Sequence, residues 1–196
     1  MSGSKFNYKK IPIEELIVLS QQSDYKALEE LIRREQKNIY ATFSYLTPGE
    51  HVSDLTQEAL FRLAKNIHTL KNPKLFKSWL NQIITNLFYD DLRKKQRRPD
   101  TVSIDEEPEN SIPIKLQLFD KKCKPAEKCI TAELEKLIKN AINNLPEQFR
   151  LAIILREFQG LSYEEIAEAT NSSIGTVKSR IARARGKLQE DLKSYI

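Results

Sequence analysis

The sequence predicts an all-α fold made of two small helical domains joined by a flexible linker, the second domain containing a helix-turn-helix. Three observations lead to this prediction. Glycine is rare, at 5 of 196 residues, and helix formers dominate. Apolar residues recur at steps of three and four, without a convincing alternating strand pattern. An acidic stretch punctuated by prolines divides the chain into two helical blocks.

The first domain is expected to span residues 1–98. Its helices are expected near 13–22, 24–46, 53–67 and 75–97. Pro48 and Gly49 break the second of these helices from the third, and Asn72 and Pro73 mark the loop before the fourth.

The linker is expected to cover residues 99–129. It contains Pro99, Pro108, Pro113 and Pro125, and no helical period persists through it. It also holds the only two cysteines, Cys123 and Cys129, without a nearby histidine. Two thiolates alone make a poor zinc site, so no metal is expected. The two cysteines are interpreted either as incidental thiols or as thiols with a redox role.

The second domain is expected over residues 130–196, with helices near 130–143, 146–159, 162–170 and 174–192. Pro146 suits the first turn of its helix. Ser162 and Glu165 have the spacing of a capping box at the next helix. The sequence from Asn171 to Ser173 then breaks that helix before the last one begins.

The last helix has an apolar stripe and an opposite face with short and basic side chains. The stripe consists of Ile174, Val177, Ile181, Ala184 and Leu188. The outward and flanking positions are Thr176, Lys178, Ser179, Arg180, Ala182 and Arg183. Small residues permit close approach to a major groove, and arginine reads guanine edges. An ordinary amphipathic helix with a solvated basic face is the alternative.

The helix near 53–67 is expected to expose Asp54, Gln57, Glu58 and Phe61 together. An aromatic side chain among acids and an amide is typical of a protein-docking face with an apolar anchor. Isolated aromatic residues are also common on surfaces, so spacing alone leaves both interpretations open.

The helix near 75–97 is expected to present Gln82, Asn86, Tyr89 and Arg93 on one side, together with Thr85. Amide groups, an aromatic ring and a cation, followed by a basic cluster, are the mixture that single-stranded DNA binding uses. A solvated polar face with a basic end is the alternative.

Taken together, these segments resemble the extracytoplasmic-function class of bacterial sigma factors. Asp54-Leu-Thr-Gln-Glu58 is similar to the D-x-x-Q-E polymerase-binding signature of that class, and Trp79-Leu-Asn-Gln-Ile-Ile-Thr-Asn86 to its W-L-x-x-I-x-x-N promoter-melting helix. Leu145-Pro-Glu-Gln-Phe149 resembles the start of its second DNA-binding module, and the segment 174–185 resembles the recognition helix of that module.

The resemblance implies a role for each segment. Asp54, Gln57, Glu58 and Phe61 would bind the clamp helices of the largest subunit of the RNA polymerase core. Residues of a base-capturing loop and of the helix beneath it would contact minus-ten promoter DNA: Lys71, Asn72, Lys74, Phe76, Gln82, Asn86, Tyr89 and Arg93. The recognition helix would read the minus-thirty-five duplex through Ser173, Thr176, Lys178, Ser179, Arg180, Ala182 and Arg183. An anti-sigma factor is also implied as a partner.

Other functional classes are disfavoured. The sequence has no phosphate-binding glycine-rich loop or metalloprotease motif, so neither an enzyme nor a cofactor is expected. No apolar run suits a membrane span or a secretory signal, so the expected location is the cytoplasm. The net charge of +5 favours a polyanionic partner. A one-component DNA-binding regulator is the main alternative, although it needs neither the docking face nor the melting helix.

Overall fold

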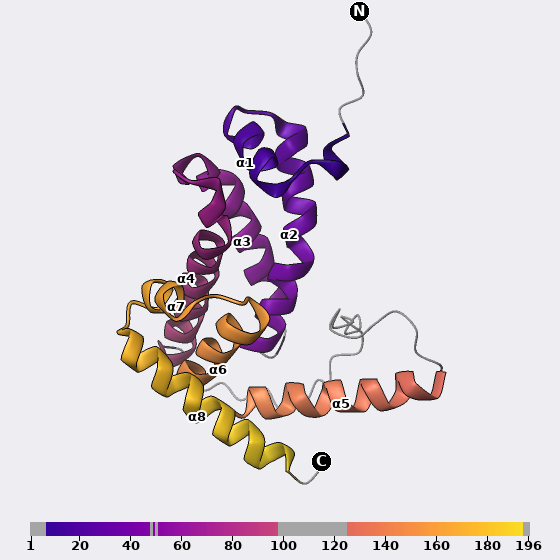
Figure 1. Ribbon diagram of the computed structural model, residues 1–196, viewed down its shortest axis with the longest axis vertical. Helices are drawn as coiled ribbons and strands as arrows, with labels where there is room; N and C mark the ends of the chain where they lie inside the picture. Colours follow the sequence, from indigo (N-terminus) through magenta and orange to yellow (C-terminus); the bar gives the residue numbers. More distant parts are fainter. Residues whose placement is uncertain (1–6, 48, 50, 98–124, 194–196) are drawn as a thin grey trace, which may run out of the picture.

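A computed structural model of the chain describes residues 7–47, 49, 51–97 and 125–193. The N-terminal domain comprises α1 (Ile13–Gln21), α2 (Tyr25–Leu46), α3 (Val52–Asn66) and α4 (Phe76–Arg97). The C-terminal domain comprises α5 (Pro125–Asn143), α6 (Glu147–Ile153), α7 (Tyr163–Ala169) and α8 (Ile174–Leu192). Within the described ranges every regular element is helical, which confirms the predicted all-α fold (Figure 1).

The N-terminal domain packs the long helices α2, α3 and α4 around a shared core, with α1 across α2 (Figure 1). Phe43 of α2 and Phe88 of α4 are its largest fully buried side chains. Asp24 caps α2, because its carboxylate accepts hydrogen bonds from the backbone nitrogens of Lys26 and Ala27. The bond from Ala27 is the main reason that the pKa of Asp24 lies below its usual value.

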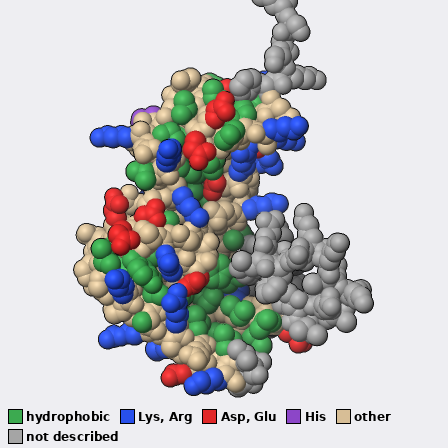
Figure 2. Space-filling model, in the orientation of Figure 1, with side chains coloured by type: hydrophobic (Ala, Val, Ile, Leu, Met, Phe, Trp, Pro, Cys, Tyr) green, Lys and Arg blue, Asp and Glu red, His purple; other side chains and the backbone are tan. Residues whose placement is uncertain are grey.

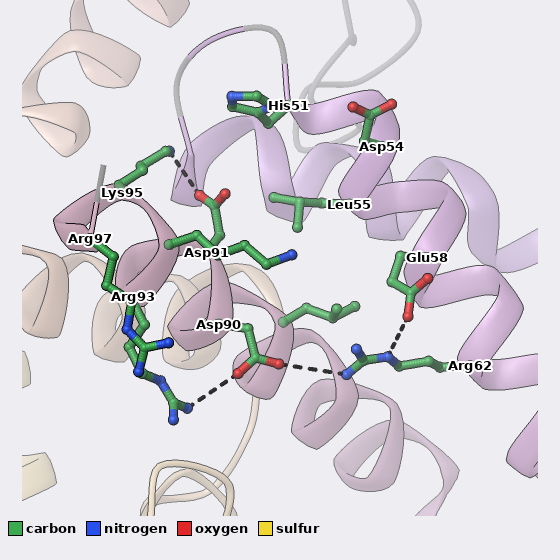
Figure 3. A pocket seen from close by; sticks show the side chains of 12 residues that line it. His51, Asp54, Leu55, Glu58, Arg62, Asp90, Asp91, Arg93, Lys95 and Arg97 are labelled. Atoms are coloured by element: carbon green, nitrogen blue, oxygen red, sulfur yellow. Dashed lines mark hydrogen bonds and ion pairs between the residues drawn. The ribbon is translucent and has the colours of Figure 1, made fainter. Parts of the chain in front are cut away.

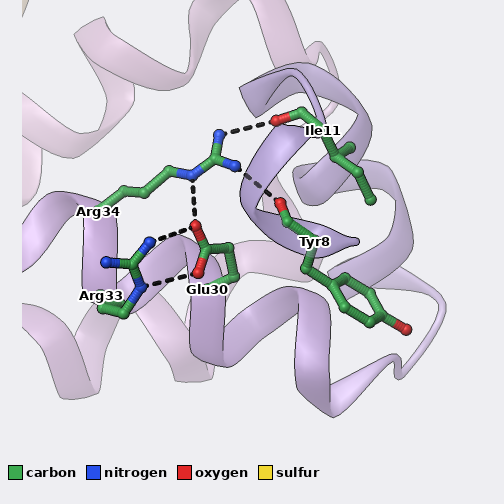
Figure 4. A network of polar contacts seen from close by, with 5 residues as sticks. All are labelled: Tyr8, Ile11, Glu30, Arg33 and Arg34. Carbon is green, nitrogen blue, oxygen red and sulfur yellow. Dashed lines mark hydrogen bonds and ion pairs between the residues drawn. The ribbon is translucent and has the colours of Figure 1, made fainter. Parts of the chain in front are cut away.

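An ion-pair network centred on the buried Glu30 connects residues that precede α1 to α2 (Figure 4). The Glu30 carboxylate accepts hydrogen bonds from Arg33 and Arg34 at 2.7–2.8 Å. Arg34 extends the network by donating to the backbone oxygens of Tyr8 and Ile11, both at 2.8 Å. These contacts hold the pKa of Glu30 at about 2, with the hydrogen bond from Arg33 as the largest cause.

The C-terminal domain has the predicted helix-turn-helix. Ser162 accepts from the backbone nitrogen of Glu165 at 3.1 Å, and the Glu165 carboxylate accepts from the Ser162 nitrogen at 2.8 Å, so the predicted capping box is present. Asn171 turns the chain with a φ of 48°, and Ser173 then caps α8. The turn therefore follows from its local sequence.

Three details of the second domain differ from expectation. Helix α5 begins at Pro125, inside the predicted linker; the linker residues 99–124, which include Cys123, lie outside the described part of the chain. Pro146 precedes α6 rather than opening its first turn. The helix predicted near 146–159 is interrupted, because α6 passes into a π-helical turn, η4 (Ile154–Phe158).

The two domains pack against each other, with α7 against α4 and with α5, α6 and η4 against α2. The aromatic rings of Tyr45 in α2 and Phe158 in η4 lie 4.6 Å apart. The Arg150 guanidinium of α6 donates to the backbone oxygen of Leu46 at 2.9 Å. One cluster of buried apolar residues consequently runs through both domains.

Candidate nucleic-acid and protein interfaces

The predicted docking residues lie on the outer face of α3. The Phe61 side chain is 61% exposed although it is large and apolar, and Lys65 Nζ lies 5.9 Å from the centre of its ring. Asp54 and Gln57 are exposed, and Glu58 is half-buried. The opposite face carries the buried Ala59 and Leu63, so packing of the core fixes which residues point outward.

A groove runs between this face of α3 and the C-terminal half of α4, with a volume of about 850 Å³ (Figure 3). A chain of charges crosses it. Arg62 Nε lies 2.7 Å from Glu58, Arg62 Nη1 lies 3.9 Å from Asp90, and Asp90 lies 3.3 Å from Arg93. The structure thus groups Arg93, predicted to contact DNA, with the acidic docking residues of α3.

The predicted base-capturing loop lies between α3 and α4. Lys71, Asn72 and Lys74 are exposed, and Asn72 Oδ1 accepts from the Lys74 nitrogen at 3.1 Å, which fixes the short helical turn η3 (Pro73–Leu75). Phe76 differs from expectation, since its side chain is only 4% exposed and packs in the core, 6.1 Å from Trp79 between ring centres. It supports the loop from beneath and offers no free surface to a base.

The predicted polar side of α4 is exposed in part and buried in part. Gln82 and Asn86 are exposed, as predicted, and Tyr89 is half-buried. Burial raises the pKa of the Tyr89 hydroxyl, and the nearby Arg180 partly opposes that shift. Thr85 was expected on the exposed side but is fully buried, one turn after Asn81, whose Nδ2 lies 3.5 Å from Gln159 Oε1 of the C-terminal domain.

The recognition helix α8 rests on Val177, Ile181 and Ala184, which are buried. Ile174 was expected in the same stripe, but it is 40% exposed because it occupies the first position of the helix, beyond the packed surface. The outward residues of the helix are exposed: Lys178, Ser179, Ala182 and Arg183. A row of short side chains flanked by cations therefore faces solvent, as approach to a major groove requires.

The remaining predicted residues of this helix make local contacts. Ser173 accepts from the Thr176 nitrogen at 3.1 Å, and Thr176 is half-buried. Arg180 is also half-buried and donates to Gln148 Oε1 of α6 at 2.9 Å. These contacts orient the first turns of α8 relative to α6.

Sequence reasoning missed two buried polar residues. Arg150 is 9% exposed and donates to the backbone oxygens of Asn143 and Leu145 as well as to Leu46. Burial lowers its pKa. Gln159 is 3% exposed and bonds to side chains of the other domain. The only signal for Arg150 was a cation within an apolar run, and Gln159 gave no signal because its partners are distant in the sequence.

Among the described residues, no group of three or more histidine, cysteine, aspartate and glutamate side chains is placed to hold a metal ion. The histidines, His51 and His68, are both exposed and stand apart from one another at the two ends of α3. No described helix is both long enough and apolar enough to cross a membrane.

Comparisons with known proteins match both halves of the chain. Residues 31–98 match the family described as Sigma-70 region 2, and residues 135–188 match Sigma-70, region 4. The ECF RNA polymerase sigma-E factor of Haemophilus influenzae is 32% identical over 178 residues, which cover 91% of this chain and 94% of the relative. The factor of the same name from Escherichia coli K12 is 32% identical over 187 residues, covering 92% and 94% of the two chains.

Solved structures give a similar result. The sigma factor RpoE of Bartonella quintana, crystallised with the anti-sigma factor NepR, is 28% identical with a TM-score of 0.61, and the match covers 87% of this chain and 97% of that one. CnrH, in complex with the cytosolic domain of CnrY, is 22% identical with a TM-score of 0.59, over 93% and 97% of the two chains. The second likeness concerns the fold alone.

Proposed function

The chain belongs to the extracytoplasmic-function family of RNA polymerase sigma factors, and we propose that it directs initiation through three separate surfaces. These are the outer face of α3, the loop and polar side of α4, and the outward face of α8. The proposed domain limits are 1–98 and 130–196, with the linker between them. The observation that carries the proposal is that one chain holds an exposed docking anchor, Phe61, and a separate basic recognition face.

The α3 face is proposed to bind the core polymerase. Phe61 provides an apolar anchor, and Asp54, Gln57 and Glu58 form a polar rim around it. A partner that fits this face has an apolar pocket bordered by basic side chains, and the clamp helices of the largest subunit are the proposed partner.

The two DNA contacts are proposed to differ in kind. The loop with Lys71, Asn72 and Lys74 and the α4 residues Gln82 and Asn86 would capture an unpaired base of the minus-ten element. The α8 face would read the minus-thirty-five element as a duplex, with Lys178 and Arg183 as exposed cations. Tyr89, Arg93, Ser173, Thr176 and Arg180 would assist by orienting these surfaces.

We further propose that the protein acts in the cytoplasm, without catalytic activity of its own, and that an anti-sigma factor controls it. The sigma factor RpoE of Bartonella quintana, which was crystallised with the anti-sigma factor NepR, supports the last point. The partner must be a protein that competes for the exposed surfaces of one or both domains.

Transcription reconstituted from sigma-free bacterial core polymerase tests this function. The purified chain is added to the core enzyme with a library of promoter fragments, and the 5′ ends of the transcripts are mapped. We expect initiation from a defined subset of promoters that share spaced minus-thirty-five and minus-ten elements. DNA binding without any chain-dependent initiation would instead identify a one-component regulator.

A further inference from the structure

We propose that the outer face of α2 is a further DNA-binding surface, which holds the phosphate backbone of a duplex without reading its sequence. This surface, the α2 row, consists of Lys26, Arg33 and Lys37 of α2 together with Lys9 of the preceding helical turn η1 (Tyr8–Lys10). The three surfaces of the proposed function do not include α2, so the inference goes beyond that function.

The three cations on α2 point in one direction. At about 100° per residue, Arg33 and Lys37 each lie about 20° from Lys26 around the helix, on opposite sides of it. All three side chains are exposed. With a rise of about 1.5 Å per residue, the row is about 16 Å long, which corresponds to about five phosphates along one strand of a duplex. Lysine and arginine side chains gather on this side of the N-terminal domain, at the upper right of the space-filling view (Figure 2).

A hollow beside α2 brings Lys9 to the row. The hollow has a volume of about 630 Å³, and its cationic lining residues are Lys9, Lys26 and Arg33. Because η1 packs against α2, cations from two separate segments of the chain reach the same hollow. A phosphate group entering it would therefore meet three positive charges.

The cations of the α2 row are available to an external anion. Glu30 lines the hollow, but it is 6% exposed and accepts hydrogen bonds from both Arg33 and Arg34, so two cations balance its charge. The Arg33 side chain nevertheless remains 59% exposed. Among the residues that the structure describes, none of the three lysines of the row forms an ion pair.

Glu29 is the carboxylate that opposes an anion at this surface. Its side chain is exposed and lines the hollow, about 60° around the helix from Lys26. Asp24, at the start of the helix, accepts a hydrogen bond from the Tyr8 hydroxyl at 2.9 Å and two more from backbone nitrogens of the first turn. Removal of the Glu29 charge should therefore strengthen the binding of a phosphate backbone.

The α2 row has the features of a duplex contact. Single strands gain much of their affinity from bases that stack on aromatic rings. The exposed ring of Tyr25 belongs to a position about 100° around the helix from Lys26, and Tyr8 is half-buried with its hydroxyl bonded to Asp24. Cations spaced along one rigid helix instead match the regular phosphates of a duplex strand, and such contacts carry no sequence information.

Paired lysine substitutions in the full-length chain test this surface. Lys26→Gln combined with Lys37→Gln removes two charges of the row and keeps polar side chains there. Lys136→Gln combined with Lys139→Gln, on α5, changes the net charge equally and is the matched control. Lys26→Arg combined with Lys37→Arg keeps both charges. Arg33 is left unchanged because it also belongs to the ion-pair network of α2.

Fluorescence anisotropy measures binding to a short duplex of scrambled sequence, and to its separated strands, over a series of salt concentrations. The glutamine pair on α2 should weaken duplex binding. It should also reduce the slope of log K against log salt concentration by about 2, because each lost phosphate contact lowers that slope by about 0.9. The arginine pair and the α5 control should keep the wild-type slope.

A second comparison has the opposite sign. Glu29→Gln should bind the duplex more tightly than Glu133→Gln, an exposed site on α5 where the same substitution gives the same net charge. Circular dichroism checks that each variant is folded.

Equal duplex affinities and slopes for the two glutamine pairs would overturn the inference, and so would a loss of binding confined to the single strands. Glu29→Gln binding no more tightly than Glu133→Gln would also contradict it. The duplex contains no promoter element and the experiment needs no polymerase, so the outcome is independent of the proposed function in initiation.

Discussion

At the scale of single residues, Arg183 and Lys187 form an informative pair on α8, because both are exposed and carry the same charge. Arg183 lies at the centre of the recognition face, whereas Lys187 lies one turn further along. Arg183→Ala should reduce discrimination between cognate and altered minus-thirty-five sequences by about 1–3 kcal/mol. Lys187→Ala should weaken binding to all sequences alike and reduce its dependence on salt. Quantitative binding to a panel of duplexes checks both, and an unchanged sequence preference in Arg183→Ala would contradict the assignment.

Glu30 gives a prediction about pH. Its pKa is about 2 in the folded chain, against a usual value of 4.5, so ionised Glu30 stabilises the fold above pH 4.5 and that contribution is lost as the pH falls toward 2. Glu30→Gln should lower the free energy of unfolding by about 2 kcal/mol at neutral pH. The difference from the wild type should shrink below pH 4.5, as urea titrations at several pH values would measure. Glu29→Gln, at the exposed neighbouring position, should have little effect.

Individual residues also mark where sequence reasoning succeeded and where it could not. Phe61 was placed correctly because helical periodicity determines which side of α3 packs. The same periodicity placed Thr85 outside, although it is fully buried one turn after Asn81, which contacts Gln159 of the other domain. Periodicity describes how one helix meets its own core, and it contains no information about a contact between domains.

At the scale of elements, the docking face of α3 gives a prediction about the polymerase. The double variant Asp54→Lys and Glu58→Lys should reduce association with the core enzyme, because it reverses two charges of the proposed rim. It also leaves Arg62 without its partner at 2.7 Å, so folding must be checked by circular dichroism. Glu29→Lys, on the exposed side of α2, is the matched reversal. Undiminished co-purification of the double variant with core polymerase would show that the partner binds elsewhere.

The capping box at the start of α7 gives a prediction about the stability of the helix-turn-helix. Ser162→Ala removes the oxygen that accepts from the Glu165 nitrogen at 3.1 Å, and should cost about 1 kcal/mol of stability. The loss should appear in the C-terminal domain, since α7 supports α8 directly. Hydrogen exchange measured by mass spectrometry should rise over α7 and α8. An equal increase in hydrogen exchange over both domains would mean that the cap has no local role.

The helices were more predictable than the connections between them. Both helices of the helix-turn-helix, with their caps, follow from local sequence because Ser162 and Ser173 bond within three residues of themselves. The π-helical turn was not predicted, since no residue between Ile154 and Phe158 distinguishes it from a continuing α-helix. The π-helical turn places Phe158 and Gln159 against α2, in the other domain.

At the scale of the whole molecule, the continuous apolar cluster predicts that the two domains unfold together. Trp79 is the only tryptophan, and it lines a cavity of about 250 Å³ together with Glu165 and Glu168 of α7, so its fluorescence reports on the N-terminal domain and on its contact with α7. Far-ultraviolet circular dichroism reports on the helices of both domains. In the wild type, the two signals should follow one urea transition.

Opening the contact between the domains should separate these signals. Gln159→Glu should open it, because the substitution removes the amide that donates to Asn38 and Thr42 of α2. In Gln159→Glu, the N-terminal domain keeps its own core of Phe43 and Phe88, whereas the shorter helices of the C-terminal domain lose the support of α2 and α4. The dichroism transition should then begin at a lower urea concentration than the Trp79 transition, and the emission of native Trp79 should shift to longer wavelength. Gln189→Glu, the same change at an exposed site on α8, should retain coincident transitions. Coincidence in Gln159→Glu as well, with an unchanged midpoint and emission, would mean that Gln159 does not couple the domains.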